Sequence, residues 1–403
     1  MKIVIFVPEF FSLSQTFIIR KVKALAERGE SVTVVSFGDS RNKAHKEILK
    51  DARNANVINI PSDNGTPLRR ILVWVFLGVK ALLTSPGDTY AFWKQARHYG
   101  SWKDRLKQFR KLLGLVGIRG DVYQFEFGDL AANYIDYLKS NAKPCIVSFR
   151  GADIDIYPHL NPQLKHVYQE VIEHADRIHC VSEAIANRAS QWGDKRKFFI
   201  NRPSVDASIF EPAALANRDP NMILSVARLK WKKGLNYALL AVAQLIPDFP
   251  SLRYVIVGEG QAKDELLFYA ADLGIRNHVE FYGRASVDEV KNLLGRTSIF
   301  LLSSLEEGIS NAVLEAMSME VPVVTTDAGG MAEAVTNGVE GFVVPRYDPD
   351  AIAENLKLLL VDEKLRLEIG SAARQRILRE FTIERQAQVF LDEYYALKRQ
   401  NEA

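Results

Sequence analysis

The order of apolar runs along the chain constrains its fold more than any other feature of the sequence. Short runs such as Cys145–Phe149 and Ile299–Leu302 are rich in Val, Ile, Leu and Phe, which is typical of strands buried on both faces of a parallel sheet. Between such runs lie longer segments, for example Leu235–Leu245, whose apolar residues are spaced as on one face of a helix. This alternation predicts an α/β fold in which helices cover both faces of parallel sheets.

The chain contains two such series, which separate near residues 201–221. Its 403 residues are too many for one ordinary core, and the segment 211–221, with two prolines, has the composition of connecting chain. We therefore expect two doubly wound, Rossmann-like domains, at 1–205 and 206–381. Because ligands of such sheets bind at the carboxyl ends of the strands, we expect a site in a cleft between two facing sheets.

The composition argues for a globular protein of a reducing compartment. Hydrophobic residues make up 47% of the chain and charged residues 25%, as in ordinary globular domains. The two cysteines, Cys145 and Cys180, lie in apolar runs and no Cys-x-x-Cys occurs, so we expect buried thiols, no disulfide framework and a cytoplasmic protein. The apolar run within Met1–Pro8 is too short for the core of a signal peptide, and the run at 71–83 is too short to span a bilayer.

The segment 68–120 is strongly basic. It holds eleven Lys and Arg against two Asp, a net charge of +9, together with three of the five tryptophans. We expect two or three helices here. Cationic helices with aromatic and aliphatic side chains suit an anionic membrane surface. A nucleic-acid contact and a merely solvated face are the alternatives. We favour peripheral attachment to the inner face of the cell membrane and expect no nucleic-acid partner.

The segment 303–325 carries the strongest chemical signal. A loop with two acids and a glycine follows a buried strand, and a helix is predicted to begin near Asn311. Loop amides and a helix N-terminus at the end of a parallel strand form an anion site, and Gly308 lets a diphosphate approach the backbone. Glu307 and Glu315 are eight positions apart, and a carboxylate at Glu315 could accept ribose hydroxyls. Ordinary solvated acids are the alternative.

A second signal lies in the segment 224–235. Its predicted strand ends before Arg228, so Arg228 and Lys233 emerge at the carboxyl end of the sheet. Two cations at that place could neutralise a departing diphosphate. The neighbouring Lys230 and Lys232 are expected to be ordinary surface cations.

Together these motifs resemble the retaining family-4 glycosyltransferases of the GT-B fold. That family is marked by two glutamates with seven residues between them, by an Ala-Met pair before a Pro-Val-Val strand, and by an Arg and a Lys before a Gly. The resemblance covers nearly the whole chain and is most specific over 222–345. The matching residues are Arg228, Lys233, Gly234, Glu307, Glu315, Ala316, Met317, Pro322, Val323, Val324, Gly329 and Gly330.

The resemblance implies a glycosyltransferase that moves a sugar, with retention of configuration, from a UDP- or GDP-sugar to a glycan or lipid-linked oligosaccharide of a bacterial surface polysaccharide. It implies that the first domain binds the acceptor, that the second binds the donor, and that the final helix, 382–403, crosses back to the first domain. It implies no cofactor and no metal. The implied catalytic residues are Glu307, Arg228, Lys233, Arg150 and Asp153. The implied donor-binding residues are Arg228, Lys233, Gly258, Gly308, Ile309, Ser310, Asn311 and Glu315.

The beginning of the chain resembles polysaccharide-building members of that family. Their usual Ser-Glu-Thr-Phe stands here as Ser14-Gln15-Thr16-Phe17. This resemblance places Ser14, Gln15 and Thr16 on the acceptor side. Because Gln15 replaces the glutamate, it is given no proton-transfer role.

Arg150 departs from the family pattern. It occupies the place of a histidine that in relatives lies beside the transferred sugar. Arg150 could instead hold an anion of the donor or acceptor, or form a structural ion pair with Asp153 or another acid. The acids at Asp153 and Asp155 are spaced like a metal motif of a different glycosyltransferase fold. Since two cations and helix amides already serve the phosphates, we expect no metal.

Two other classes of function stay open as alternatives. A nucleotide-sugar epimerase could share the fold, and a non-enzymatic nucleotide-sugar-binding protein could keep part of the site. A dinucleotide oxidoreductase is disfavoured, because the turn at Gly258 and Gly260 lacks the third glycine of the dinucleotide fingerprint.

Overall fold

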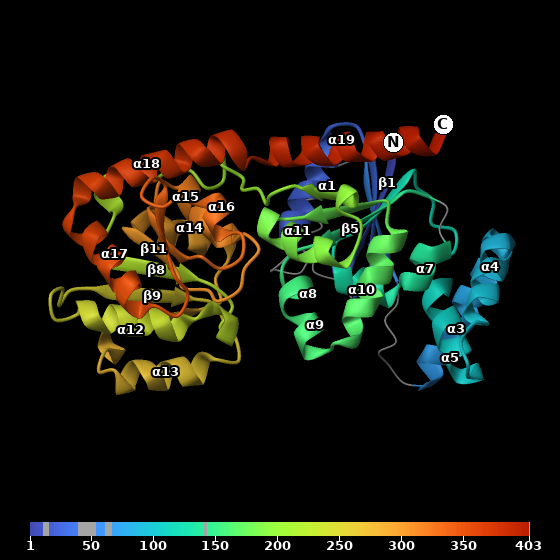
Figure 1. Ribbon diagram of the computed structural model, residues 1–403, viewed down its shortest axis with the longest axis horizontal. Coiled ribbons are helices and arrows are strands. Elements are labelled where there is room, and N and C mark those ends of the chain that lie inside the picture. The colour runs from blue at the N-terminus through green and yellow to red at the C-terminus, as the bar shows by residue number, and fades with distance from the viewer. Residues whose placement is uncertain (11–15, 39–53, 61–66, 141–142, 403) are drawn as a thin grey trace. The chain divides into compact units, whose positions relative to one another are not determined.

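The structure is a computed structural model that describes residues 1–10, 16–38, 54–60, 67–140 and 143–402 (Figure 1). The chain divides into two compact units. The first comprises Met1–Cys180, Ala186–Asn201 and Ala387–Ala403, and the second comprises Val181–Ile185 and Arg202–Gln386. Each unit is built on one parallel sheet covered by helices, so the prediction of two doubly wound α/β domains is confirmed.

The first unit has a seven-stranded sheet in the order β3-β2-β1-β4-β5-β6-β7. The strand order reverses between β1 and β4, which makes their carboxyl ends a topological switch point. The short strand β7 was missed by the sequence analysis, because it holds only three residues after a basic turn. The strands are β1 (Lys2–Val7), β2 (Ser31–Ser36), β3 (Ala55–Asn59), β4 (Val122–Phe125), β5 (Cys145–Phe149), β6 (Arg177–Cys180) and β7 (Phe198–Ile200).

The helices around this sheet follow the apolar spacing with two differences. The segment 128–140 has continuous helical apolar spacing but forms two helices, because Tyr134 leaves the helical conformation with φ −117° and ψ 30°. The short helices α8 and α9 had no sequence signal. The helices are α1 (Thr16–Glu27), α6 (Gly128–Asn133), α7 (Ile135–Ser140), α8 (Ala152–Asp155), α9 (Tyr157–Leu160), α10 (Gln163–His174) and α11 (Glu183–Ala189).

The last helix, α19 (Ile383–Glu402), completes the core of the first unit. Its residues Phe390, Leu391 and Tyr394 are buried in one cluster with Ile3 and Ile5 of β1. Cys145 and Cys180 are buried free thiols in the same unit, as predicted.

The basic segment forms three helices, α3 (Pro67–Thr84), α4 (Pro86–Ala96) and α5 (Trp102–Leu113), which Figure 1 shows as a separate group in the first unit. Pro86 opens α4 at its first position, where its missing N–H is not needed. The side chain of Ser101 caps α5 by accepting the N–H of Asp104.

The second unit has a six-stranded sheet in the order β10-β9-β8-β11-β12-β13. Its switch point lies between β8 and β11. The strands are β8 (Met222–Val226), β9 (Arg253–Val257), β10 (Val279–Gly283), β11 (Ile299–Leu302), β12 (Val323–Thr326) and β13 (Gly341–Val344). The helices are α12 (Leu235–Leu245), α13 (Lys263–Asp272), α14 (Val287–Arg296), α15 (Asn311–Ser318), α16 (Met331–Ala334), α17 (Pro349–Val361) and α18 (Glu363–Glu380). Apolar clusters fill both faces of the sheet.

Candidate functional site

The predicted site residues of the second unit gather at the carboxyl ends of β8 and β11. Two loops meet there, one from β8 to α12 and one from β11 to α15. The N–H of Leu305 donates to the carbonyl of Lys232 at 2.8 Å. Gly234 has a φ of +57°, and a Cβ on it would lie 2.2 Å from the carbonyl oxygen of Ser303. Glycine is therefore required at 234 for the two loops to pack against each other.

An ion pair joins the two loops. Lys233 Nζ contacts Glu307 Oε1, and the Ser304 hydroxyl donates to the same oxygen at 2.9 Å. The two charged side chains are 12% and 11% exposed, so the pair is largely buried but open on one side. Burial alone would raise the pKa of Glu307, but the charge and hydrogen bond of Lys233 outweigh it and lower the pKa.

Further positive charge surrounds this pair. Arg228 is exposed, and within the described parts of the chain no acid pairs with its guanidinium. Lys232 is half-buried; burial lowers its pKa, and the like charges of Lys233, Arg228 and Lys230 add to that effect, opposed by Glu307. Lys232 is therefore not the ordinary surface cation that its sequence context suggested. Cations in excess of acids at the ends of parallel strands favour an anionic ligand.

Helix α15 begins beside the same loop. Ile309 is buried in the core and anchors the loop, while the N–H of Ser310 donates to the sulfur of Met331 at 3.4 Å. Asn311 Oδ1 is buried and accepts no hydrogen bond from the described residues. Glu315 lies one turn further along α15 and is half-buried. An unsatisfied buried acceptor at Asn311 is costly unless a ligand supplies a donor.

Glycines hold the remaining loops of the site close together. A Cβ on Gly258, whose φ is +137°, would lie 1.9 Å from the carbonyl oxygen of Ala227, next to Arg228. A Cβ on Gly329, whose φ is +57°, would lie 1.7 Å from the carbonyl oxygen of Glu307. Gly308 accepts the N–H of Gly330 at 2.8 Å. These backbone contacts fix the loop that carries Glu307.

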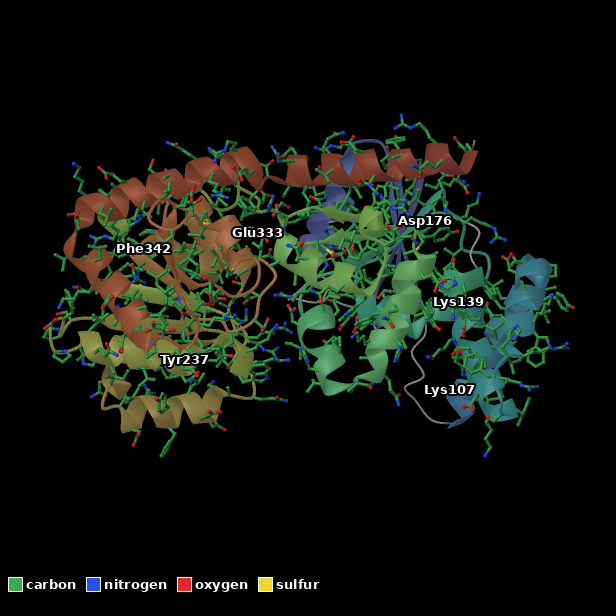
Figure 2. All side chains as sticks on the ribbon, in the orientation of Figure 1. Lys107, Lys139, Asp176, Tyr237, Glu333 and Phe342 are labelled. Carbon is green, nitrogen blue, oxygen red and sulfur yellow. The ribbon has the colours of Figure 1, made fainter. Side chains whose placement is uncertain are left out.

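Glu333, labelled in Figure 2, has a structural role that the sequence did not reveal. Its two carboxylate oxygens accept the N–H groups of Glu183 and Ala184 at 2.9 Å each, at the first turn of α11. Ser182 accepts the N–H of Ile185 at 3.2 Å, and Arg202 donates to Glu333 at 3.1 Å. Since these partners lie about 150 positions away, no local pattern could have indicated this contact.

In the first unit, Arg150 forms a structural ion pair, one of the alternatives stated above, and its partner is Glu126 rather than Asp153. Its guanidinium binds the carboxylate of Glu126, and its Nε donates to the Glu126 carbonyl at 3.0 Å. Asp153 instead accepts backbone N–H groups, from Arg150 and Gly151 at 2.9 Å and from Gly128 at 3.2 Å. The predicted residues Ser14 and Gln15 lie outside the described residues, and Thr16 opens α1.

The Arg150–Glu126 pair belongs to a buried network that sequence reasoning missed. Lys21 Nζ lies 2.7 Å from Glu126 Oε1 and 2.6 Å from Gln124 Oε1. Burial lowers the pKa of Lys21 to about 8, although Glu126 opposes this. Burial acts to raise the pKa of Glu126, but Lys21 and Arg150 hold it at about 2. No sequence motif singled out Lys21 or Glu126.

His179 lies in the same buried layer. Its ring nitrogens bond to the Ser148 hydroxyl at 3.0 Å and to the Asn201 carbonyl at 2.8 Å. Burial, with the charge of Arg150, lowers the pKa of His179 to about 3. The imidazole is therefore neutral at physiological pH.

The acids that suggested a metal motif have protein partners. Asp155 pairs with Arg188 at 2.6 Å, and Asp153 is occupied by the three N–H groups described above. Across the described ranges, no group of three or more His, Cys, Asp and Glu side chains is placed to hold a metal ion. In the same ranges, no helix combines the length and apolar character needed to cross a bilayer.

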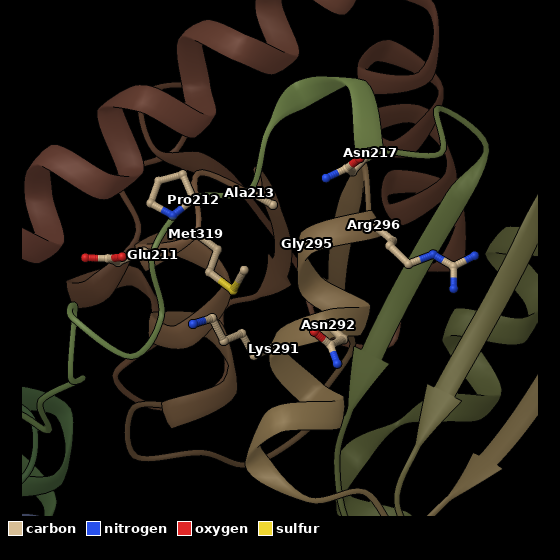
Figure 3. Close-up of a pocket in the computed structure, with 9 residues that line it drawn as sticks. All are labelled: Glu211, Pro212, Ala213, Asn217, Lys291, Asn292, Gly295, Arg296 and Met319. Carbon is tan, nitrogen blue, oxygen red and sulfur yellow. The ribbon is translucent and has the colours of Figure 1, made fainter.

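A pocket of about 510 Å³ lies elsewhere on the second unit (Figure 3). Its lining includes Lys291, Gly295 and Arg296 at the end of α14 and Met319 after α15. Figure 3 shows Lys291 directed toward Met319 and Arg296 directed away from it. The pocket adjoins the amino ends of β8 and β11, the wrong edge of the sheet for a ligand of this fold, and none of the predicted site residues lines it.

The geometry therefore defines a class: a two-sheet α/β protein with a cationic candidate site at the switch point of its second sheet. Residues 208–376, which contain nearly all of that site, match the family described as Glycosyl transferases group 1. The chain is 29% identical over 377 residues to the putative colanic acid biosynthesis glycosyltransferase WcaL of Escherichia coli (strain K12), covering 88% of this chain and 90% of the relative. It is 27% identical over 410 residues to the amylovoran biosynthesis glycosyltransferase AmsK of Erwinia amylovora, covering 94% and 96%.

The fold is similar to that of solved glycosyltransferases. A glycosyltransferase from Rickettsia africae ESF-5 superposes with a TM-score of 0.71 at 19% identity, covering 98% of both chains. Anabaena Alr3699/HepE in complex with UDP also gives 0.71, at 17% identity, covering 98% of this chain and 100% of that one. Residues 208–376 therefore form a group 1 glycosyltransferase domain, and the protein is a glycosyltransferase of the GT-B architecture.

Proposed function

We propose that this glycosyltransferase moves a sugar from a UDP- or GDP-sugar to a glycan or lipid-linked oligosaccharide during assembly of a bacterial surface polysaccharide, with retention of configuration and without a metal. One observation carries the proposal: the half-open Lys233–Glu307 pair, with the exposed Arg228 beside it, at the switch point of the second sheet. The printed names of the relatives, which refer to colanic acid and amylovoran biosynthesis, support the class of product.

In this proposal Lys233 exchanges its partner Glu307 for the donor diphosphate. In the absence of a donor, Lys233 and Glu307 neutralise each other. When the diphosphate binds, Lys233 turns to it together with Arg228. Glu307 is then free to accept hydroxyl groups of the donor sugar, and Asn311 and Glu315 hold the ribose. The N–H groups around Gly308, Ile309 and Ser310 complete the cradle, with Gly258 shaping the wall near Arg228.

The chemistry follows from where charge develops. The bond between the anomeric carbon and the diphosphate oxygen breaks, and a bond from that carbon to the acceptor oxygen forms on the same face. The acceptor proton passes to the departing phosphate oxygen. Two fixed cations at Arg228 and Lys233 stabilise the negative charge on the leaving group, and the carboxylate of Glu307 stabilises positive charge near the anomeric carbon. No step needs a metal ion.

The first unit supplies the acceptor side in this proposal. Ser14, Gln15 and Thr16 contact the acceptor, and Arg150 and Asp153 shape the loop after β5. Arg150 is held by Glu126 and packs over the ring of Phe17, 4.2 Å from its centroid. The contacts of Arg150 favour a positioning role for this residue.

Product analysis tests the proposed reaction. Wild-type protein is incubated with each UDP- and GDP-hexose, a lipid-linked oligosaccharide fraction and EDTA, and the new linkage is characterised by NMR. The proposal expects a glycosidic bond with the anomeric configuration of the donor, formed equally with EDTA. Conversion of the donor without an acceptor would identify an epimerase, and binding without turnover would identify a non-enzymatic binding protein. An inverted linkage or an EDTA-sensitive reaction would contradict the mechanism.

We also propose that α3 attaches the protein to the inner face of the cell membrane. Seven large apolar side chains of this helix are each more than half exposed: Ile71, Leu72, Val75, Phe76, Val79, Leu82 and Leu83. Helix α3 is anchored from behind by the buried Ala81 and by Trp74, whose ring lies 4.3 Å from the Arg110 guanidinium. An exposed apolar patch on a basic group of helices can insert at the boundary between the headgroups and the acyl chains of anionic lipids.

The charges around α3 favour a lipid surface over an ordinary solvated face. The two acids of the segment are occupied: Asp88 pairs with Arg119 at 2.7 Å, and Asp104 accepts the Ser101 hydroxyl at 2.6 Å. Lys103 and other cations of α4 and α5 are exposed. The local excess of positive charge is therefore available to anionic headgroups.

Flotation with vesicles tests this attachment. Val75→Asp/Phe76→Asp is expected to abolish binding to vesicles rich in anionic lipid, and Lys103→Gln/Lys107→Gln to weaken it. Phe268→Asp is the matched control, because Phe268 is a 74% exposed aromatic in the second unit. If wild-type protein stays unbound, or if the control loses binding to the same extent as the α3 variant, the attachment through α3 is wrong.

A further inference from the structure

Tyr347 has an unusual backbone conformation for its residue type. Its φ is +66°, and among the described non-glycine residues only Glu320 shares a positive φ. An aromatic side chain in this left-handed region costs free energy that a glycine would not. The side chain is nevertheless 57% exposed, so burial in the core does not offset the cost.

The turn itself does not require a tyrosine. Tyr347 lies between β13 and α17, and the next residue, Asp348, caps α17 by accepting the N–H of Ala351 at 2.9 Å. Pro349 follows at the start of the helix. A glycine at position 347 would make the same turn without strain. Strained backbone conformations cluster at binding and active sites. The strain at Tyr347 is therefore explained if its ring has a binding role.

The ring of Tyr347 is part of an aromatic pair. It meets the ring of Tyr237 at a centroid distance of 5.5 Å and an interplanar angle of 85°. Tyr237, labelled in Figure 2, belongs to the first turn of α12 and is half-buried against the apolar core. The N–H of Tyr237 donates to the carbonyl of Gly234 at 2.9 Å. Tyr237 therefore supports the exposed ring of Tyr347 from a rigid element beside the candidate donor site.

Polar groups border the aromatic pair. Arg346 Nε lies 3.2 Å from Asp327 Oδ1, and Arg346 Nη1 lies 3.6 Å from Glu306 and 3.3 Å from the Leu305 carbonyl. Asp327 Oδ2 accepts no hydrogen bond from the described residues. Through Leu305 this group adjoins the loop that carries Glu307.

We propose that Tyr347, backed by Tyr237, is a binding platform for the face of a pyranose ring at the rim of the donor site. The C–H face of a pyranoside packs on an aromatic ring, while its hydroxyl groups bond to neighbouring carboxylate and guanidinium groups. Here these are Asp327, Arg346 and Glu306. The inference rests on the proposed glycosyl transfer for its sugar ligand. It adds a saccharide contact that the residues around Lys233 do not provide.

Matched variants separate the ring from the backbone at this position. Tyr347→Gly removes the ring and relieves the strain, so it is expected to fold with an equal or higher melting temperature. Tyr347→Phe keeps the ring. The probes are methyl α-D-glucopyranoside and methyl β-D-galactopyranoside, followed by saturation-transfer difference NMR, with UDP and GDP measured separately on the same samples.

The proposal expects at least one pyranoside to receive saturation from wild type and Tyr347→Phe, with affinity in Tyr347→Gly reduced roughly two- to tenfold. Nucleotide signals are expected to be equal in all three proteins. Equal pyranoside signals in wild type and Tyr347→Gly, or none in wild type, would overturn the proposal. Loss of nucleotide-base signals in Tyr347→Gly would show a base platform instead and would also overturn it. Arg228→Ala/Lys233→Ala should lose nucleotide signals only, so failure of the donor site is distinguishable.

Discussion

Each unit of this protein pairs a lysine from the segment after one strand of the switch point with a glutamate that follows the other strand, and the two pairs differ in their access to water. In the second unit, Lys233 and Glu307 are 12% and 11% exposed and have exposed cations as neighbours. In the first unit, Lys21 and Glu126 are 2% and 0% exposed, and Arg150 closes over the same carboxylate. The same pair of residue types after corresponding strands thus forms a half-open ion pair in one unit and a sealed network in the other.

Hydrogen bonding explains why only one pair is free to exchange partners. Glu126 is shared by two cations, and Lys21 also bonds to Gln124. No ligand can reach this carboxylate without unfolding its surroundings. Glu307 has one cation and the Ser304 hydroxyl, and a diphosphate can replace it as the partner of Lys233. The first pair should therefore govern stability, and the second should govern binding.

The largest expected effect is on stability. Glu126→Gln leaves Lys21 and Arg150 as buried cations without a counter-charge, which should lower the free energy of unfolding by about 3–5 kcal/mol. Lys21→Met keeps the Glu126–Arg150 pair and should lose less. Urea unfolding measures both. A loss below about 1 kcal/mol for Glu126→Gln would contradict the role assigned to the sealed network.

The matched change in the open pair should act on catalysis. Glu307→Gln and Lys233→Ala are each expected to reduce kcat/KM roughly 10²–10³-fold, because each removes charge stabilisation in the transition state. Their unfolding midpoints in urea should fall less than that of Glu126→Gln, since the charge left unpaired keeps some contact with water. If Glu307→Gln destabilises the protein as much as Glu126→Gln does, the distinction between the two pairs is lost.

Acid is expected to lower the stability of the first unit, because two of its buried groups have lowered pKa values. His179 has its pKa lowered from 6.5 to about 3, so the unfolded state binds a proton before the native state does. Stability is therefore full above about pH 6.5 and falls with decreasing pH, by up to about 1.4 kcal/mol per pH unit for one proton. Glu126, lowered from 4.5 to about 2, adds a second loss as the pH falls from 4.5 to 2.

Unfolding free energies measured in urea from pH 7 to pH 4 test this dependence. His179→Asn is expected to flatten the slope between pH 6 and pH 4, because the titrating group is gone. A wild-type stability that does not change over this range would contradict the buried, neutral state of His179.

The smallest expected effect concerns Glu333, which the fold uses as a cap. Glu333→Ala removes the acceptor for two N–H groups of α11 and should cost about 1 kcal/mol, the usual value of a helix cap. Nucleotide binding is expected to be unchanged, since the Glu333 carboxylate is occupied by Glu183 and Ala184. A thermal melt with and without UDP measures both quantities. A loss of the UDP-dependent shift would place Glu333 in the donor site. Glu333 would then act in binding as well as in stability.

Most of the architecture could be predicted from the sequence, because parallel strands buried on both faces leave continuous apolar runs. The limits of β5 and β11 agree with the predicted runs to the residue. The break at Tyr134 could not be predicted, because its neighbours continue a helical apolar pattern. The short helices α8 and α9 and the strand β7 are too brief to show any periodicity.

The site could be predicted in part. Gly234, Lys233 and Glu307 lie in two local motifs, and the sequence placed them at strand ends, where the structure joins them. The sealed network could not be predicted, because Lys21 and Glu126 are more than a hundred positions apart and each is unremarkable in its own segment. Arg150 was correctly given a structural ion pair as one alternative, but with Asp153 named first and Glu126 not named.

If the Lys233–Glu307 pair and Arg228 hold the nucleotide sugar, a thermal-shift panel with nucleotides will detect their binding. Wild type, Arg228→Ala/Lys233→Ala and the control Phe268→Asp are melted with UDP, GDP, ADP and their common sugars, each with and without EDTA. A ligand at a hundred times its Kd stabilises by about 2.7 kcal/mol, which a melt resolves readily. One nucleotide class is expected to stabilise wild type and the control, but not the double variant, regardless of EDTA. Equal stabilisation of the double variant would contradict the assignment of the site. The absence of a nucleotide-dependent shift in all three proteins would contradict it as well.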